Sequence, residues 1–397
     1  YVAIGYRALG ANTTANYNTA VGRDALMANT TGERNVAVGF QAGVANTTGN
    51  YNIAIGDRAL DANTTGGGNT AIGASALGAN TTADGNTAIG DNALLLNTTG
   101  SSLVAIGQSA LDANTTATRN VAVGNGAMGA ATTGGSNVGI GTTALSGLTT
   151  GTNNVAVGDN AGDALSTGTH CTYLGGAVAS YSTATGNNNT GVGNSALFSL
   201  TSGYNNVAVG YVAGYDITSG FENAILGTDA GQNLTGGYRN VAIGMNALET
   251  ATTVNTNVAI GYDCGNDLTG SGSTLIGFSA GDLITTPDYN ICIGYEAGSS
   301  TTNLTTGEKN LLIGAYSHTS ASDGAHQIVL GYNVAGSGSS TFTFGNAGSD
   351  TTISFGTTTW SNPSDVRIKE DIKDEEIGLS FINDLRPRTF RYRKEKD

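Results

Sequence analysis

Apolar residues recur in this chain at fixed positions of a short repeat. The phrase Asn-x-Ala-Val/Ile-Gly ends at glycines that stand 17 residues apart for ten consecutive steps, from Gly5 to Gly175. The series then continues, with small changes of spacing, to Gly331. A full unit such as residues 69 to 85 has no apolar stripe of helix length, but it has room for two strands of about four residues and two turns.

This unit predicts one coil of an all-β parallel β-solenoid, or β-roll. About twenty coils, stacked roughly 4.8 Å apart, give a rod on the order of 95 Å long. The residue before each glycine is Val, Ile or Leu, as at Ile89, and we expect these residues to form a buried aliphatic column. The residue before that is usually Ala, as at Ala20 and Ala37. We expect this alanine column to face a neighbouring solenoid at close range, because alternate residues of a strand point to opposite faces.

The second half of each unit shows compensating changes of side-chain size. Units that read Ala-Leu usually carry Asn three residues after the Leu, as in Leu26 and Asn29. Units that read Ala-Gly tend to carry an aliphatic residue there, such as Leu165 or Ile217. Keeping the summed volume constant is what a densely packed core demands, so both kinds of unit predict one shared core.

Asn-Thr-Thr recurs at the same place in seven units, beginning at Asn12, Asn29, Asn46, Asn63, Asn80, Asn97 and Asn114. Each is a possible N-glycosylation site, but the strict register favours a stacked ladder of Asn side chains that satisfies the turns. The paired threonines also raise the alternative of an ice-binding surface. Adjacent residues of a strand point to opposite faces, however, so only half of these hydroxyls share a plane.

Composition and charge narrow the class of partner. The chain has 61 Gly, 3 Pro and 12% charged residues, a mixture typical of short strands and tight turns. The net charge of −14 lies in residues 1–363, because residues 364–397 carry nine charges of each sign. This acidity argues against nucleic acid and bare anionic lipid as partners. No stretch reaches transmembrane length, so we expect no membrane insertion.

Candidate chemistry is sparse within the repeats. Cys264 and Cys292 take alanine positions and Cys171 takes an Asn position, so we expect three buried thiols without catalytic partners. The three histidines and the aspartates are dispersed, and their spacing matches no metal motif or paired-carboxylate site. We therefore expect neither a metal nor a cofactor.

The phrases NTAIG and NVAVG, repeated through residues 1–331, resemble the head repeats of trimeric autotransporter adhesins and of phage tail fibres. The segment Ser364–Lys369, followed by GLSFINDLRPRTFRYR at 378–393, resembles the opening of the endosialidase-type intramolecular chaperone. The resemblance implies a homotrimeric fibre of parallel β-rolls. Its chaperone trimerises, guides folding and cuts itself off. Autotransporters end instead in a membrane-anchoring barrel, so the chaperone-like segment favours the phage fibre.

The same resemblance implies a self-cleavage site, with Ser364 supplying the hydroxyl, Lys369 the base, and the Ser364–Asp365 bond as the one that is cut. A lysine acts as a base only when burial lowers its pKa enough to leave it neutral. In an extended strand the two side chains would lie roughly 16 Å apart. A sharp bend, or Lys369 from a neighbouring chain, must therefore bring them together.

We thus expect three regions: a β-solenoid at 1–331, a slender trimeric β neck at 332–363, and the start of an α/β chaperone and autoprotease domain at 364–397. In the neck, Phe342 and Phe344 share one strand face, around which three chains could pack.

The expected function is that of a structural and adhesive fibre on a virion tail, or outside the cell. Its expected partners are its own copies, a glycan or protein receptor on the host surface, and tail or baseplate proteins bound through a part that precedes Tyr1. A bacterial trimeric surface adhesin and a capsule depolymerase fibre remain the alternatives.

Overall fold

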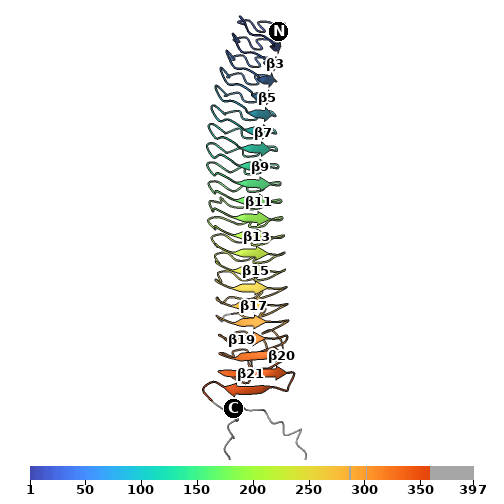
Figure 1. Ribbon diagram of the computed structural model, residues 1–397, viewed down its shortest axis with the longest axis vertical. Helices are drawn as coiled ribbons and strands as arrows, with labels where there is room; N and C mark the ends of the chain where they lie inside the picture. Colours follow the sequence, from blue (N-terminus) through green and yellow to red (C-terminus); the bar gives the residue numbers. More distant parts are fainter. Residues whose placement is uncertain (286–287, 301, 358–397) are drawn as a thin grey trace, which may run out of the picture.

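The computed structural model describes residues 1–285, 288–300 and 302–357, and these form a slender rod of stacked coils (Figure 1). Within these residues the structure is all-β and contains no helix. The strands are β1 (Val2–Ile4), β2 (Thr19–Val21), β3 (Val36–Val38), β4 (Ile53–Ile55), β5 (Thr70–Ile72), β6 (Thr87–Ile89), β7 (Val104–Ile106), β8 (Val121–Val123), β9 (Val138–Ile140), β10 (Val155–Val157), β11 (Thr172–Leu174), β12 (Thr190–Val192), β13 (Val207–Val209), β14 (Ala224–Leu226), β15 (Val241–Ile243), β16 (Val258–Ile260), β17 (Thr274–Ile276), β18 (Ile291–Ile293), β19 (Leu311–Ile313), β20 (Ile328–Tyr332), β21 (Thr341–Asn346) and β22 (Thr351–Ser354).

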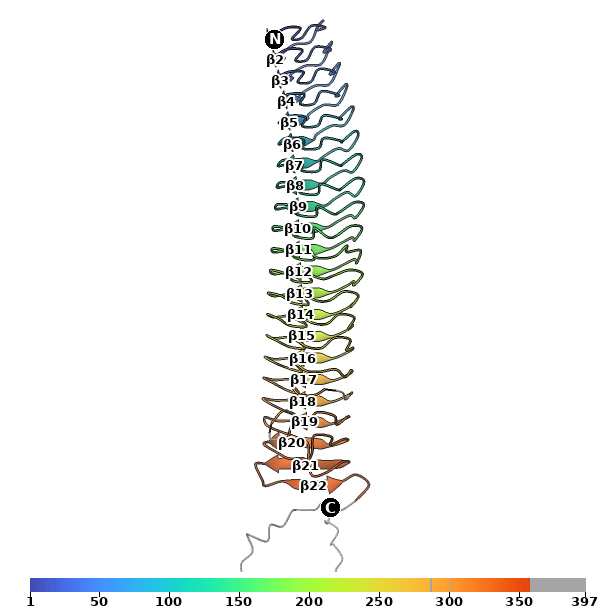
Figure 2. The same ribbon diagram turned by 180° about the vertical axis from the view of Figure 1, so that it is seen from behind.

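Each strand from β1 to β20 pairs in parallel with the next strand along the chain, always in the same register. In β5 and β6, for example, Ala71 lies opposite Ala88, which is one repeat of 17 residues further on. The turns are hydrogen-bonded from coil to coil as well, as in the bond from Leu26 N–H to the Ala42 carbonyl at 3.0 Å. The predicted parallel β-solenoid of about twenty coils with a 17-residue repeat is therefore confirmed (Figure 2).

The repeated glycine marks the bend that ends each strand. At Gly90, for instance, φ is +136°, a conformation that side chains strongly disfavour. A Cβ atom on Gly90 would also lie only 2.5 Å from the Gly107 carbonyl oxygen of the next coil. Because each coil meets the next one in this way, no other residue fits, and this explains why the glycine recurs without exception.

The prediction of which strand face is buried was wrong. The central alanine of each strand, such as Ala20 or Ala88, is fully buried inside its own coil, whereas the flanking residues Thr87 and Ile89 are only half-buried on the outside. The alternation was predicted correctly but its direction was inverted. The coil is narrow, so the inner face of the strand accepts only a small side chain, and the bulky aliphatic residues point outward.

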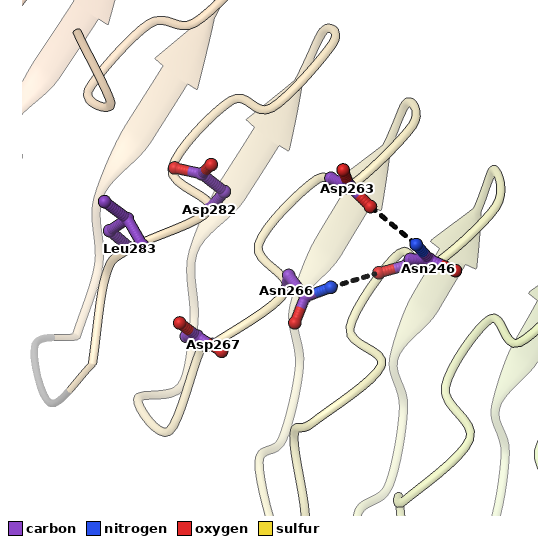
Figure 3. A pocket seen from close by; sticks show the side chains of 6 residues that line it. All are labelled: Asn246, Asp263, Asn266, Asp267, Asp282 and Leu283. Atoms are coloured by element: carbon purple, nitrogen blue, oxygen red, sulfur yellow. Dashed lines mark hydrogen bonds between the residues drawn. The ribbon is translucent and has the colours of Figure 1, made fainter.

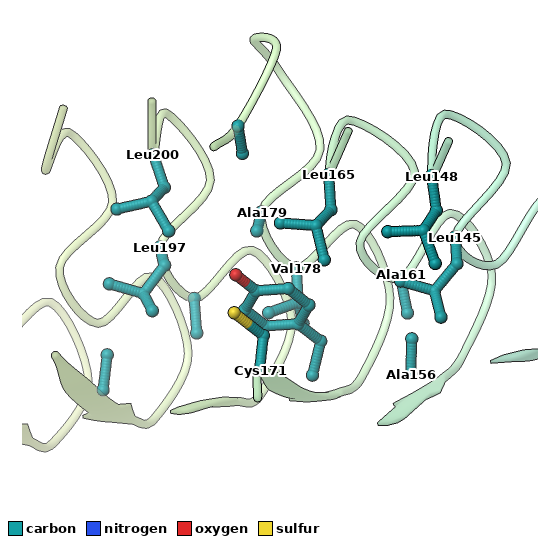
Figure 4. Close-up of a cluster of buried hydrophobic side chains, with 14 of the residues drawn as sticks. Leu145, Leu148, Ala156, Ala161, Leu165, Cys171, Val178, Ala179, Leu197 and Leu200 are labelled. Atoms are coloured by element: carbon teal, nitrogen blue, oxygen red, sulfur yellow. The ribbon is translucent and has the colours of Figure 1, made fainter. Parts of the chain in front are cut away.

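The interior is completed by residues of the turns opposite each strand. Figure 4 shows Leu145, Leu148 and Leu165 among the side chains that stack from coil to coil. The predicted exchange of volume is present: a Cβ atom on Gly214 would lie 3.0 Å from Cδ1 of Ile217, so the aliphatic residue occupies the space that a Leu at position 214 would need. Both kinds of unit share one core.

Two ladders of buried Asn side chains run along the rod. In the predicted Asn-Thr-Thr ladder, Asn63 Nδ2 donates to Asn46 Oδ1 at 2.9 Å and to the Gly66 carbonyl at 3.0 Å. A second ladder lies four residues before most bend glycines. There, the backbone N–H of Asn69 donates to Asn52 Oδ1 at 3.0 Å. The amides thus satisfy backbone groups that the narrow coil buries away from water.

The solenoid sheet continues past residue 331 into the region predicted as a neck. Strand β21 pairs in parallel with β20, and β22 then turns back and pairs antiparallel with β21. Phe342 lies opposite Ile353 on one face of this pair, while Thr343 and Thr352 are buried on the other. The packing of three chains around this segment stays a prediction, as does the α/β segment at 364–397, which lies outside the described residues.

Candidate functional site

The outer face of the parallel sheet is a long apolar surface of the described chain. In each strand from β1 to β20 the first and third residues point outward, on either side of a second residue that is buried from β2 onward. Typical exposed fractions are 36% for Val155, 38% for Val157 and 39% for Ile313. We call these two columns of side chains the outer sheet face.

The outer sheet face carries no charge along the twenty strands. All of its side chains are Val, Ile, Leu, Thr or Ala. At about 95 Å by 10 Å it covers on the order of 1,000 Å². The largest apolar patch of an ordinary monomer is about 300–600 Å². A surface of this size and composition is suited to burial against another protein surface.

Stacked aromatic rings form ladders elsewhere on the rod. Tyr204, Phe221 and Tyr238 stack at centroid distances of 4.9 and 4.8 Å, almost parallel to one another. Tyr262, Phe278 and Tyr295 form a similar column directly after the bend glycines, at 5.1 and 4.9 Å. The middle ring of each column stacks against a neighbouring ring on both of its faces. These ladders therefore stabilise the stacking of coils rather than offering open ring faces to a ligand.

Among the shallow hollows on the described surface, two are lined mainly by polar residues. One, of about 320 Å³, lies beside the turns that follow β15, β16 and β17 and is lined by Asp263, Asp267 and Asp282 together with Asn246, Asn266 and Leu283 (Figure 3). Asn246 Nδ2 donates to Asp263 Oδ1 at 2.7 Å. Burial raises the pKa of Asp282 above its usual range. The second hollow, of about 350 Å³, lies around Arg119 and contains no carboxylate.

The sequence-derived candidates for chemistry are not brought together within the described residues. Cys171, Cys264 and Cys292 are buried, unpaired thiols, and burial raises the pKa of Cys264 to about 12. Such thiols are protonated and poorly reactive at neutral pH. Among residues 1–285, 288–300 and 302–357, no group of three or more His, Cys, Asp or Glu side chains could hold a metal ion.

The proposed self-cleavage residues Ser364, Asp365 and Lys369 lie outside the described residues, so their roles stay predictions from the resemblance. In the part of the chain that the structure describes, no helix is long and apolar enough to cross a membrane. No protein-family model matches the chain, and no curated protein matches it.

Sequence reasoning missed the outer sheet face and the hollow around Arg119. The signal for the first was present: charged residues never occupy the two positions that flank the central residue of each strand, although they are common in the turns. The Val, Ile or Leu residue before each glycine was instead predicted to be buried inside the coil. No spacing singles out Arg119, because the same turn position also carries Arg34, Arg239 and Lys309 in other coils.

Proposed function

We propose that this chain is the shaft of a homotrimeric adhesive fibre, a phage or phage-like tail fibre that contacts the surface of a host cell. The observation that carries the proposal is the uncharged outer sheet face, which runs along all twenty parallel strands. The resemblance of the repeats to fibre and adhesin heads supports the number of chains, and the chaperone-like segment at 364–397 supports the phage over the bacterial adhesin.

The partners proposed for the outer sheet face are further copies of the same chain. A standard protein interface buries about 800 Å² on each partner, and this face offers on the order of 1,000 Å². A partner must match a straight, flat, uncharged strip of the same length, which another copy in parallel does by its own repeat. In a closed ring of three, each chain needs two contact surfaces, and two columns of side chains are available.

A rod of this kind suits contact at a distance. Its coils repeat a similar surface along the whole length, and a trimer would present each surface three times. Several weak contacts to a glycan or protein receptor would then add up through avidity. The described chain has no built catalytic constellation, so adhesion accounts for its features better than catalysis does.

The test is the oligomeric state of the purified fibre, measured by analytical ultracentrifugation at micromolar concentration. We expect a trimer, and we expect Val155→Glu together with Val157→Glu to yield monomers with intact β structure by circular dichroism. Leu96→Glu is the matched control, since Leu96 is 50% exposed but lies in a turn outside the outer sheet face. A monomeric parent chain would overturn the proposal. Cleavage of capsule by the parent fibre would favour the depolymerase instead, with the acidic hollow as its place.

A further inference from the structure

Arg119 is the one basic side chain among residues 1–285, 288–300 and 302–357 that has neither a carboxylate nor an aromatic ring as a partner. The other six are engaged as follows: ion pairs at Arg7, Arg23, Arg239 and Lys309, and aromatic rings at Arg34 and Arg58. A free guanidinium is therefore an exception in a chain whose net charge is −14.

Arg119 lines the second hollow, which spans the turns of three successive coils. Gly135 forms part of the hollow one coil further on. A Cβ atom at Gly135 would lie 2.8 Å from the Thr118 carbonyl oxygen, so a larger residue could not sit there without moving the backbone. The glycine thus leaves open a space that side chains fill elsewhere in this column, such as that of Tyr238.

The rest of the lining is polar and uncharged. Thr116, Thr118, Thr133 and Ser136 line the hollow, and their hydroxyls make no hydrogen bond to another described side chain or carbonyl. Asn153 adds an amide at the far side. One guanidinium with several free hydroxyls is a set that suits a ligand carrying a single carboxylate and several hydroxyl groups.

The geometry points to a binding subsite for an acidic sugar, a hexuronate-type residue of a surface glycan, whose carboxylate pairs with Arg119 while its hydroxyls bond to the surrounding threonines. The inference rests on the proposed surface-contact function and names the receptor chemistry. A volume of about 350 Å³ is at the lower end of small-molecule sites, which fits one sugar residue of a longer chain. None of the lining residues belongs to the outer sheet face, which is the surface that the proposed assembly buries.

The site also fits the charge of the whole molecule. A polyanion such as nucleic acid would be repelled along the rod, but a single carboxylate inside a hollow without acidic lining meets one near cation. Arginine suits this task because its planar donors match the two oxygens of a carboxylate.

The test is to titrate the full fibre separately with methyl glucuronide, methyl glucoside and inorganic phosphate. Binding is monitored by nuclear magnetic resonance of the arginine side chains. We expect saturable millimolar binding of methyl glucuronide and binding at least ten-fold weaker for methyl glucoside. Arg119→Gln should weaken glucuronide binding at least ten-fold. Arg34→Gln is the matched control, because Arg34 occupies the same place in its coil but lies against Tyr17 and Tyr51, and it should bind like the parent.

Equal binding of the two sugars, or unchanged binding by Arg119→Gln, would overturn the inference. Phosphate binding as tight as that of methyl glucuronide would overturn the assignment to a sugar and leave a plain anion site. Because one chain supplies the whole lining, this titration reads the hollow in any oligomeric state. A monomeric parent that still binds methyl glucuronide would therefore reject the fibre proposal alone.

Discussion

The first seven coils and the later coils fill the same interior position in opposite ways. Seven residues after the bend glycine, the early coils carry an Asn, from Asn12 to Asn114, and this Asn is buried from Asn29 onward. In most later coils, beginning with Ala131, the same position is apolar, as at Leu148, Leu165 and Leu200, and equally buried. We call these the polar section and the apolar section of the rod.

The two sections differ in how tightly each coil depends on the next. An Asn in the polar section is satisfied by its neighbours, so it needs an Asn in register both before and after it. The ladder must also end: Asn114 still donates to Asn97 Oδ1 at 2.8 Å, but its own Oδ1 is buried without a partner. Apolar contacts are non-directional and tolerate shifts. Accordingly, the coils of 18, 16 and 20 residues, which end at Gly193, Gly277 and Gly314, all lie in the apolar section.

The strongest way to break this comparison is to place a polar-section residue in the apolar section. In Leu165→Asn, the new amide nitrogen would donate one hydrogen bond to the Gly168 carbonyl. The new amide oxygen would face Ala184 and would find no donor there. Together with the lost apolar burial, we expect local stability to fall by about 3 kcal/mol. Amide hydrogen exchange of the coils around Leu165 measures this. Leu165→Met, which keeps the volume, is the control and should cost about 1 kcal/mol or less.

The converse change tests the ladder itself. Asn63→Ala removes the donor to Asn46 Oδ1 and the acceptor that Asn80 Nδ2 uses at 2.9 Å. We expect a loss of about 2 kcal/mol, because a buried oxygen is left without a partner. Asn114→Ala should cost only about 1 kcal/mol, since it also removes the orphaned Asn114 oxygen. Equal losses at both sites in hydrogen exchange would show that the amides act independently and not as a ladder.

Acid should stabilise the apolar section more than the polar section. Burial raises the pKa of Asp163 to about 6, and one oxygen of that carboxyl is buried without a partner. Asp61 occupies the same place in a polar-section coil, and its pKa is raised by burial as well. A raised folded pKa means that the native state binds the proton more tightly than the unfolded chain. Stability therefore rises as the pH falls from about 7 through 6 toward 4.

We expect a gain of about 1 kcal/mol from Asp163 over this range, reduced from the full shift because the carboxyl is partly exposed. Asp163→Asn should raise the melting temperature at pH 7 and flatten its dependence on pH. Asp61→Asn is the matched comparison and should have a smaller effect. A melting temperature of Asp163→Asn below that of the parent at pH 7 would contradict the assignment.

The sequence was sufficient to predict the architecture because every coil repeats the same demands. The bend glycine, the exchange between Gly214 and Ile217, and the Asn-Thr-Thr ladder were all predicted from spacing and size. Which face of each strand is buried was not predicted correctly, because the alternation of residues is the same whichever face is inside. Only the width of the coil decides it, and that width depends on how the turns close, which the pattern around Ala20 does not encode.

The candidate site was less predictable for a related physical reason. Which residues form the outer sheet face depends on which strand face is buried. Because that prediction was inverted, the outer sheet face was not predicted. The hollow around Arg119 depends on three neighbouring coils at once, including the missing side chain of Gly135. Such a feature has no period, and only the stacking of the coils brings its parts together.

The smallest expected effect tests whether the two sections share their turns. Five residues before the bend glycine, the backbone is left-handed in both sections, with φ of +59° at Ser102 and +57° at Thr256. Gly85 holds the same position with φ of +67°. Replacing either residue by glycine removes roughly 1 kcal/mol of backbone strain. Glycine also gives the unfolded chain more conformational entropy, and this lowers stability by a similar amount. Ser102→Gly and Thr256→Gly should therefore each change stability by only a few tenths of a kcal/mol, and by the same amount.

The converse substitution is the control for this comparison. A Cβ atom at Gly85 would meet no other atom within 4 Å, so Gly85→Ala changes only this balance of strain and unfolded-state entropy, and it should likewise change stability by a few tenths of a kcal/mol. Thermal unfolding of the three variants side by side gives the answer. If Ser102→Gly and Thr256→Gly differ by about 1 kcal/mol, the strain of one left-handed residue, the sections differ in their turns as well. Equal small effects would confine the difference between the sections to the single interior column that changes from Asn to aliphatic residues.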